Sequence, residues 1–273
     1  MSKSLPYVTE NTLEKTRTFA DILFQDSSDM DTRFVNTING IEQLIEDLPA
    51  STSLLYIDVQ GRKSAGQNVI SILTILPAGS NTIYIIDVDQ LGGIAFVTKG
   101  PGGDRTIRSI LESPDVTKVF FFMRNPHGLW AADRIRLQGA EDIHIMENAY
   151  RAMIDPDSPS FTLMECVQKD LTNCPVVLVP TFCQQVFRVS NLLSDPQYGG
   201  SYDVLFRRPL HPDITIYCSF VVIGLRELRN KYWGRLTTDL RTKVNETTQR
   251  RVELTQNYTA WSAMDVDNLT NSW

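Results

Sequence analysis

The stretch Leu54-Leu55-Tyr56-Ile57-Asp58-Val59 is a continuous apolar run that contains one acid and ends at Gln60-Gly61. Two more apolar runs follow it, residues 69–76 and residues 81–88, and the links between the three runs are short and rich in turn residues. Three such runs in succession are typical of an antiparallel meander. We therefore expect three neighbouring strands, with Asp58 at the end of the first one.

Downstream of the meander, strand-like and helix-like segments alternate. The apolar runs at residues 118–123 and 143–146 predict two further strands, and residues 163–171 and 214–236 have apolar side chains at helical spacing. Residues 238–257 predict a charged final helix. Alternation of this kind after a meander indicates an α/β fold around a mixed sheet.

Composition and charge limit the class of protein. The chain has 273 residues, 42% of them hydrophobic, and a formal net charge of −6. These values are typical of a globular protein and exclude wholesale disorder and a strongly basic coat for nucleic acid, but not a local basic strip. No run approaches the ~20 apolar residues of a membrane span, so we expect no membrane contact.

The ends of the chain and its cysteines give weaker indications. Residues 1–35 are polar and mixed in charge, and they predict an N-terminal arm with a lead-in helix. Residues 36–257 are expected to form one domain, and residues 258–273 an acidic C-terminal tail. The first residues lack the apolar segment of a secretory signal, and the four cysteines show no zinc or redox spacing. We therefore expect reduced thiols and a cytoplasmic or nuclear location.

Several blocks of the sequence resemble one family in their order and spacing. Residues 55–61, the meander, residues 118–122 and residues 217–221 are similar to the RNase D-type 3′–5′ exonucleases of the DEDD group. Residues 137–143 and 243–251 resemble the fungal and Exd-like (exonuclease-domain-containing) branch in particular. The resemblance covers residues 35–257. It implies a ribonuclease H-like fold, with a mixed five-stranded sheet flanked by helices.

The resemblance also defines the expected site. Nucleases of this family hold two divalent metals about 4 Å apart with four acids. The first acid is present as Asp58, but the second position holds Gln60, and the third falls most simply at His127, because no Asp or Glu occurs between residues 116 and 132. The tyrosine that orients the attacking water is present as Tyr217, whereas Val221 stands in place of the fourth acid. We expect Tyr217 on a helix that faces Asp58.

One acid of four remains, so the sequence predicts a pseudonuclease without a two-metal site and without a cofactor. Each remaining residue also has a plain structural interpretation, such as a strand-end carboxylate for Asp58 or a packed ring for Tyr217. The predicted vestigial pocket consists of Asp58, Gln60, His127, Tyr217, Phe220 and Val221.

The first functional hypothesis is binding of single-stranded RNA without cleavage, through phosphate contacts and base stacking. The resemblance implies an RNA-pathway adaptor that works as a homodimer or with a protein partner. For any single cation, an ordinary surface charge is the plainer interpretation. The candidate contacts are Arg62, Lys63, Arg124, Trp130, Arg207 and Arg208, with Tyr202 and Tyr217 as further aromatic surfaces.

Two other hypotheses belong to different classes. The old pocket could serve a metal-independent enzyme that acts on a small organic ligand, with Asp58, His127 and Tyr217 as an acid–base set. Replacement of acids by Val and His, rather than by Asn or Ala, favours such a rebuilt pocket. A scaffold that binds only proteins would instead use the charged final helix and the acidic tail.

Overall fold

The computed structural model describes residues 30–48, 51–64, 67–121, 124–155, 159–174, 177, 179–195, 197 and 200–257. Side chains at positions 63, 64, 67, 124–127 and 257 also lie outside the description. The predicted lead-in helix and the predicted acidic tail fall outside the described residues.

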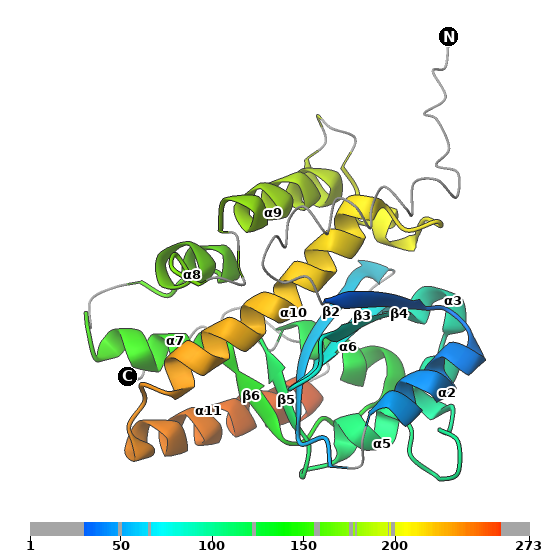
Figure 1. Cartoon of the computed structure of the whole chain (residues 1–273), viewed down its shortest axis with the longest axis horizontal. Coiled ribbons are helices and arrows are strands. Elements are labelled where there is room, and N and C mark those ends of the chain that lie inside the picture. The colour runs from blue at the N-terminus through cyan, green and yellow to red at the C-terminus, as the bar shows by residue number, and fades with distance from the viewer. Residues whose placement is uncertain are drawn as a thin grey trace.

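A mixed sheet of six strands forms the centre of the described part of the chain, in the order β1-β4-β3-β2-β5-β6 (Figure 1). Strands β2, β3 and β4 are antiparallel neighbours, which confirms the predicted meander. Strand β1 is parallel to β4, β5 to β2, and β6 to β5. The strands are β1 (Asp31–Val35), β2 (Leu54–Ser64), β3 (Gln67–Pro77), β4 (Thr82–Asp87), β5 (Thr117–Phe120) and β6 (Ala140–Asp142).

The prediction of five strands is wrong by one, because β1 was assigned to the N-terminal arm. Four of its five residues are exposed, so the strand carries no apolar pattern. Its place in the sheet comes from backbone pairing with β4, from Asp31 opposite Thr82 to Val35 opposite Ile86.

The apolar run at residues 143–146 is the start of a helix, α7 (Ile143–Ala152), and the strand β6 lies just before it. The Asp142 side chain accepts a hydrogen bond from the His144 backbone N–H at 3.0 Å and thereby caps the helix. A short apolar run does not distinguish a buried helix from a strand, which explains the wrong prediction.

Strand β2 continues past Asp58 to Ser64, so Asp58 lies in the middle of the strand and not at its end. The pairing with β3 shifts register between Gln60 and Gly61, as in a β-bulge. A Cβ atom at Gly61 would lie 2.1 Å from the Val69 carbonyl oxygen. The close approach of the two backbones therefore requires glycine there. This glycine allows the β2–β3 hairpin to continue beyond Asp58.

Helices cover both faces of the sheet, and a hydrophobic core fills each side. On one face α10 crosses the strands, with α7, α8 and α9 beyond it (Figure 1). On the other face lie α2 to α6, and α11 packs against β6, α6 and α7. The helical segments are α2 (Ile38–Asp47), α3 (Val88–Leu91), α4 (Ile94–Val97), α5 (Ile107–Glu112), α6 (Arg124–Asp133), α7, α8 (Leu163–Asp170), α9 (Val179–Ser194), the 3-10 turn η2 (Tyr202–Phe206), α10 (Pro212–Trp233) and α11 (Thr238–Asn257).

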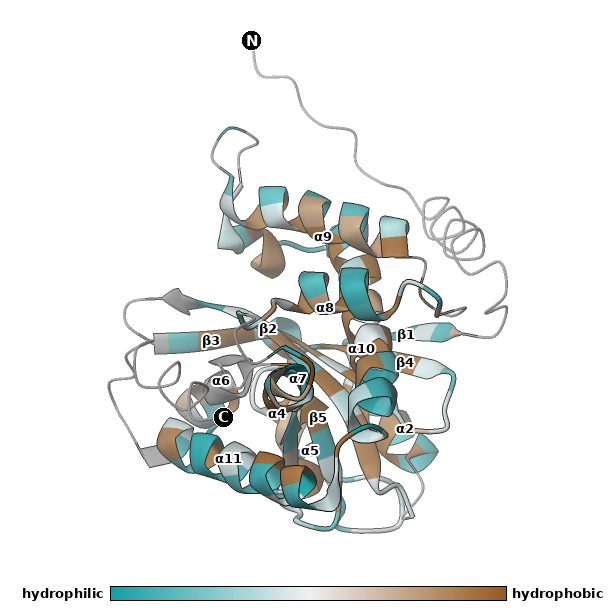
Figure 2. Cartoon of the chain, turned by 90° about the vertical axis from the view of Figure 1, so that its left-hand side faces the viewer, coloured by the Kyte–Doolittle hydropathy of each residue, from teal (hydrophilic) through white to brown (hydrophobic). Residues whose placement is uncertain are grey.

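Hydrophobic residues are frequent along the strands, whereas hydrophobic and hydrophilic residues alternate along the helices (Figure 2). Alternation along β2 decides which side chains face α10: Tyr56 belongs to the core on the α10 side, and Ile57 and Val59 belong to the other core. Asp58 shares the side of Tyr56. Within the described residues, no helix is both long and apolar enough to span a bilayer.

Helix α11 is fixed to the sheet by a buried ion pair. The Arg251 side chain is 1% exposed, and its Nη1 lies 2.7 Å from Oδ2 of Asp142, which is fully buried. The carboxylate of Asp142 therefore joins three elements, because it ends β6, caps α7 and holds α11.

Lys118 on β5 is a cation in the interior of the fold. Its Nζ donates hydrogen bonds to the carbonyl oxygens of Ser113, at 2.6 Å, and Ile110, at 3.4 Å, at the end of α5. Burial lowers the pKa of Lys118 to about 7. The amine of the folded protein thus loses its proton at a much lower pH than that of the unfolded chain.

This depressed pKa predicts a stability that rises with pH. Between the folded pKa of about 7 and the unfolded pKa of about 10.4, the unfolded state binds the additional proton, so alkali favours folding. We expect the free energy of unfolding of the wild type to gain about 1.4 kcal/mol per pH unit relative to Lys118→Met across this window. Urea unfolding at several pH values measures it. The control is Lys99→Met, which replaces an exposed lysine. If the difference in unfolding free energy between the wild type and Lys118→Met is as independent of pH as that for Lys99→Met, the prediction is contradicted.

Candidate functional site

Asp58 is the acid at the centre of the predicted vestigial pocket. It lies on β2, faces α10 and is only 6% exposed. Its Oδ2 accepts a hydrogen bond of 2.7 Å from the Nε2 of Gln60, two residues further along the same face of the strand. The amide that replaces the expected glutamate therefore points at the remaining carboxylate.

Tyr217 on α10 completes a short polar chain with Gln60 and Asp58. The Tyr217 hydroxyl shares a hydrogen bond with the Gln60 side chain. Burial, and next the charge of Asp58, raise the pKa of Tyr217 far above its ordinary value, so the phenol stays protonated. The same two causes raise the pKa of the neighbouring Cys218 thiol. The structure thus has Tyr217 on a helix that faces Asp58, as expected.

The next turn of α10 is apolar. Val221 is 2% exposed and Phe220 is 7% exposed, and both belong to the core between α10 and the sheet. The expected place of the third acid, His127, lies on helix α6. Its side chain falls outside the described residues.

These residues do not fit a two-metal centre. Mg²⁺ prefers several oxygen ligands in octahedral geometry, whereas this site offers one carboxylate that already accepts an amide, a neutral phenol and a buried valine. Across the described ranges, no three His, Cys, Asp or Glu side chains are placed to hold a metal ion. These described side chains therefore do not support a metal-dependent reaction step.

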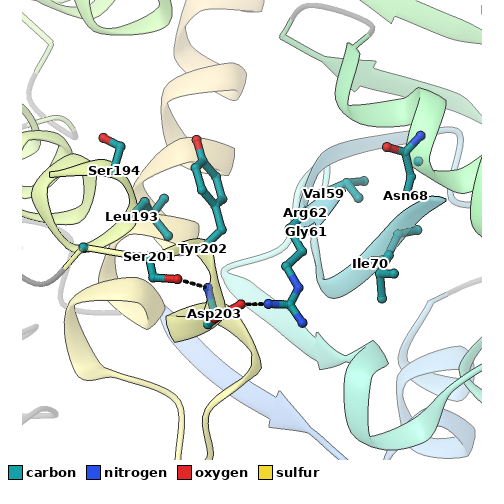
Figure 3. A pocket seen from close by; sticks show the side chains of 13 residues that line it. Val59, Gly61, Arg62, Asn68, Ile70, Leu193, Ser194, Ser201, Tyr202 and Asp203 are labelled. Atoms are coloured by element: carbon teal, nitrogen blue, oxygen red, sulfur yellow. Dashed lines mark hydrogen bonds and ion pairs between the residues drawn. The ribbon is translucent and has the colours of Figure 1, made fainter. Parts of the chain in front are cut away.

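A groove of about 770 Å³ lies along the β2–β3 hairpin, where Val59 and Gly61, the chain neighbours of Gln60, line it (Figure 3). The described side chains of the vestigial pocket do not line this groove. One wall consists of described residues of β2 and β3, the other of residues at the end of α9 and residues 200–203, and α6 contributes Gly128. The described residues that line the groove are Val59, Gly61, Arg62, Asn68, Val69, Ile70, Gly128, Leu193, Ser194, Gly200, Ser201, Tyr202 and Asp203.

The groove combines an aromatic ring with one ion pair. The Tyr202 side chain is about half exposed, and its hydroxyl is close enough to Tyr217 to act on the pKa of that residue. The Arg62 guanidinium pairs with the Asp203 carboxylate across the groove and lies over the Phe206 ring, 4.5 Å from its centroid (Figure 3). A ring and a guanidinium side by side are suited to a base and a phosphate.

The structure brings only part of the predicted nucleic-acid set to this groove. Arg62 and Tyr202 line it, whereas Arg208 forms a bidentate ion pair with the buried Asp87, at 2.5 Å for each contact, and serves the fold. Trp130 lies on α6 and has two other arginines over its ring. The guanidinium carbons of Arg134 and Arg136 lie 5.2 and 5.7 Å from the ring centroid. Arg207 is exposed at the end of η2, and the side chains of Lys63 and Arg124 lie outside the described residues.

Sequence reasoning missed Asp203. It follows a turn-rich stretch of mixed loop sequence, where a single acid carries no signal of its own. Its pairing with Arg62 joins positions far apart in the chain, and only the packing of η2 against β2 brings them together.

No protein-family model and no curated protein matches the sequence. Among solved structures, the chain is similar to Trypanosoma brucei RNase D in its GMP complex, with a TM-score of 0.64, 15% identity, and coverage of 89% of this chain and 72% of that one. For the same enzyme in complex with RNA U12, the TM-score is 0.62 and the identity 15%, and the match covers 91% of this chain and 83% of that one. For Brucella melitensis NrnC bound to pGG, the TM-score is 0.52 and the identity 17%, and the match covers 83% of this chain and 92% of that one.

At identities this low, the likeness shows the fold. The chain has the ribonuclease H-like α/β fold of the DEDD exonuclease domains. This fold assignment rests on the likeness to the structures of RNase D and NrnC.

Proposed function

We propose that this chain binds the end of a single-stranded RNA in the groove beside Asp58 and does not cleave it. It would act as an adaptor, in the cytoplasm or the nucleus, that works as a homodimer or with a protein partner. The proposal extends the ribonuclease H-like fold to a function in which recognition remains and the metal chemistry is lost.

The observation that carries the proposal is the hydrogen-bonded chain of Asp58, Gln60 and Tyr217 next to an open groove. The amide of Gln60 satisfies the one acid that remains, so the site is stable without a cation. The groove next to it keeps the volume and the aromatic ring that a nucleotide needs. RNase D is described with GMP and with RNA U12, and NrnC with pGG, and this supports an RNA ligand here.

The test uses the full chain and 5′-labelled U12, the RNA of the RNase D complex. We expect binding by fluorescence anisotropy that is unchanged by EDTA, and full-length RNA on denaturing gels after incubation with Mg²⁺ or Mn²⁺. The replacement Tyr202→Ala removes a stacking surface worth about 1–3 kcal/mol per base, so the Kd rises by roughly 5- to 150-fold.

A matched control is Phe187→Ala on α9, because Phe187 is another exposed aromatic residue, is 64% exposed and does not line the groove. It should leave the Kd for U12 unchanged. Equal losses in both variants would place the RNA elsewhere. Metal-dependent ladders that disappear in Asp58→Ala would show an active nuclease and overturn the proposal.

A further inference from the structure

We infer that Asp203 competes with an RNA phosphate for Arg62 in the groove: its carboxylate occupies the position beside Arg62 that an RNA phosphate would take. A bound strand must then displace Asp203 from Arg62. This inference rests on the proposed function, because it concerns how the same groove accepts RNA.

The geometry places Asp203 for this role. It is the second residue of η2, and its backbone N–H donates a hydrogen bond of 3.1 Å to the Ser201 side chain, which caps this turn (Figure 3). The capped turn directs the carboxylate across the groove to Arg62 on β2. Asp203 therefore reaches Arg62 from the opposite wall.

The two partners differ in how firmly they are held. The Arg62 side chain is 32% exposed and lies over the Phe206 ring, so it keeps a support when its partner leaves. The Asp203 side chain is 57% exposed and can turn to water without loss of buried contacts. The acid is thus the member of the pair that a ligand can displace.

The pair also sets the charge of the groove. Among the described residues that line it, Arg62 is the one cation and Asp203 the one acid, so their charges cancel. A phosphate that approaches Arg62 meets a carboxylate of the same sign as its own. Asp203 therefore weakens phosphate binding, and stacking on Tyr202 contributes a larger share of the affinity.

The experiment compares the wild type with Asp203→Asn, which keeps the size of the side chain and removes its charge. We expect the Kd for U12 to fall by about tenfold. Because one more phosphate is neutralised, the slope of log K against log salt should steepen by about 0.7. In the Arg62→Ala background, the same replacement should change neither quantity.

The control is Asp104→Asn, which removes an exposed acid that pairs with Lys99 and does not line the groove. It should leave the affinity and the slope unchanged. If Asp203→Asn also leaves both unchanged while Tyr202→Ala weakens binding, the inference is wrong and the proposed function stands. If neither the wild type nor Asp203→Asn binds U12, the proposed function itself fails.

Discussion

Replacement of Arg251 by Met is expected to lower the free energy of unfolding by about 3–5 kcal/mol. The Arg251 guanidinium is buried against Asp142, and its removal leaves a carboxylate in the interior without the cation that faces it. Because Asp142 ends β6 and caps α7, the loss affects the edge of the sheet and two helices. Urea unfolding of the full chain at neutral pH measures the change.

The neighbouring Arg250 provides the matched control, since it lies on the same helix and is exposed. Arg250→Met removes the same charge and should change the stability by less than about 0.5 kcal/mol. The double variant Arg251→Met/Asp142→Asn should recover part of the loss, because it removes the buried carboxylate charge together with the guanidinium. Equal effects of the two single variants would show that the buried pair contributes no more than a surface charge.

The second large effect is expected from Val221→Asp, which places an acid at the position where the family resemblance predicts the fourth one. Val221 is 2% exposed among apolar neighbours, so a carboxylate there costs about 3–5 kcal/mol unless a cation or hydrogen bonds compensate it. We expect the variant to be strongly destabilised at neutral pH. Val221→Thr, which has nearly the same shape and no charge, should lose much less.

The combination Gln60→Glu/His127→Asp/Val221→Asp tests whether metal binding can offset the loss of stability caused by the buried carboxylate. We expect no heat with Mn²⁺ at millimolar concentration and no gain in melting temperature, because apolar side chains fill the space around position 221. The absence of heat must come from a folded sample, which circular dichroism checks. Saturable Mn²⁺ binding with cleavage of U12 would contradict the prediction and show that the nuclease geometry persists.

The parts of the fold that the sequence could predict are those with strong local patterns. The meander was predictable because three apolar runs stand between turn-rich links, and α10 because its apolar residues recur at helical spacing over many turns. The pairing of Tyr217 with the region of Asp58 came from the family resemblance, and the structure places the two residues close together.

The remaining features depend on contacts between distant residues. Strand β1 is exposed except at Val35 and starts with three polar residues, so its sequence does not indicate pairing with β4. The run after Asp142 becomes a helix because of a cap, which apolar spacing does not reveal. The bulge at Gly61 depends on how closely β3 approaches, and the partnership of Arg62 with Asp203 depends on the docking of η2.

The link between Asp142 and Arg251 also bears on the order in which the molecule can be assembled during translation. The two residues are 109 positions apart, and the guanidinium is supplied by the final described helix. While a ribosome is still extending the chain, the edge strand β6 therefore has no counter-charge from α11. Completion of that side of the molecule has to wait until position 251 has emerged, and until then chaperones would meet a nascent chain whose edge strand β6 is not yet covered by α11.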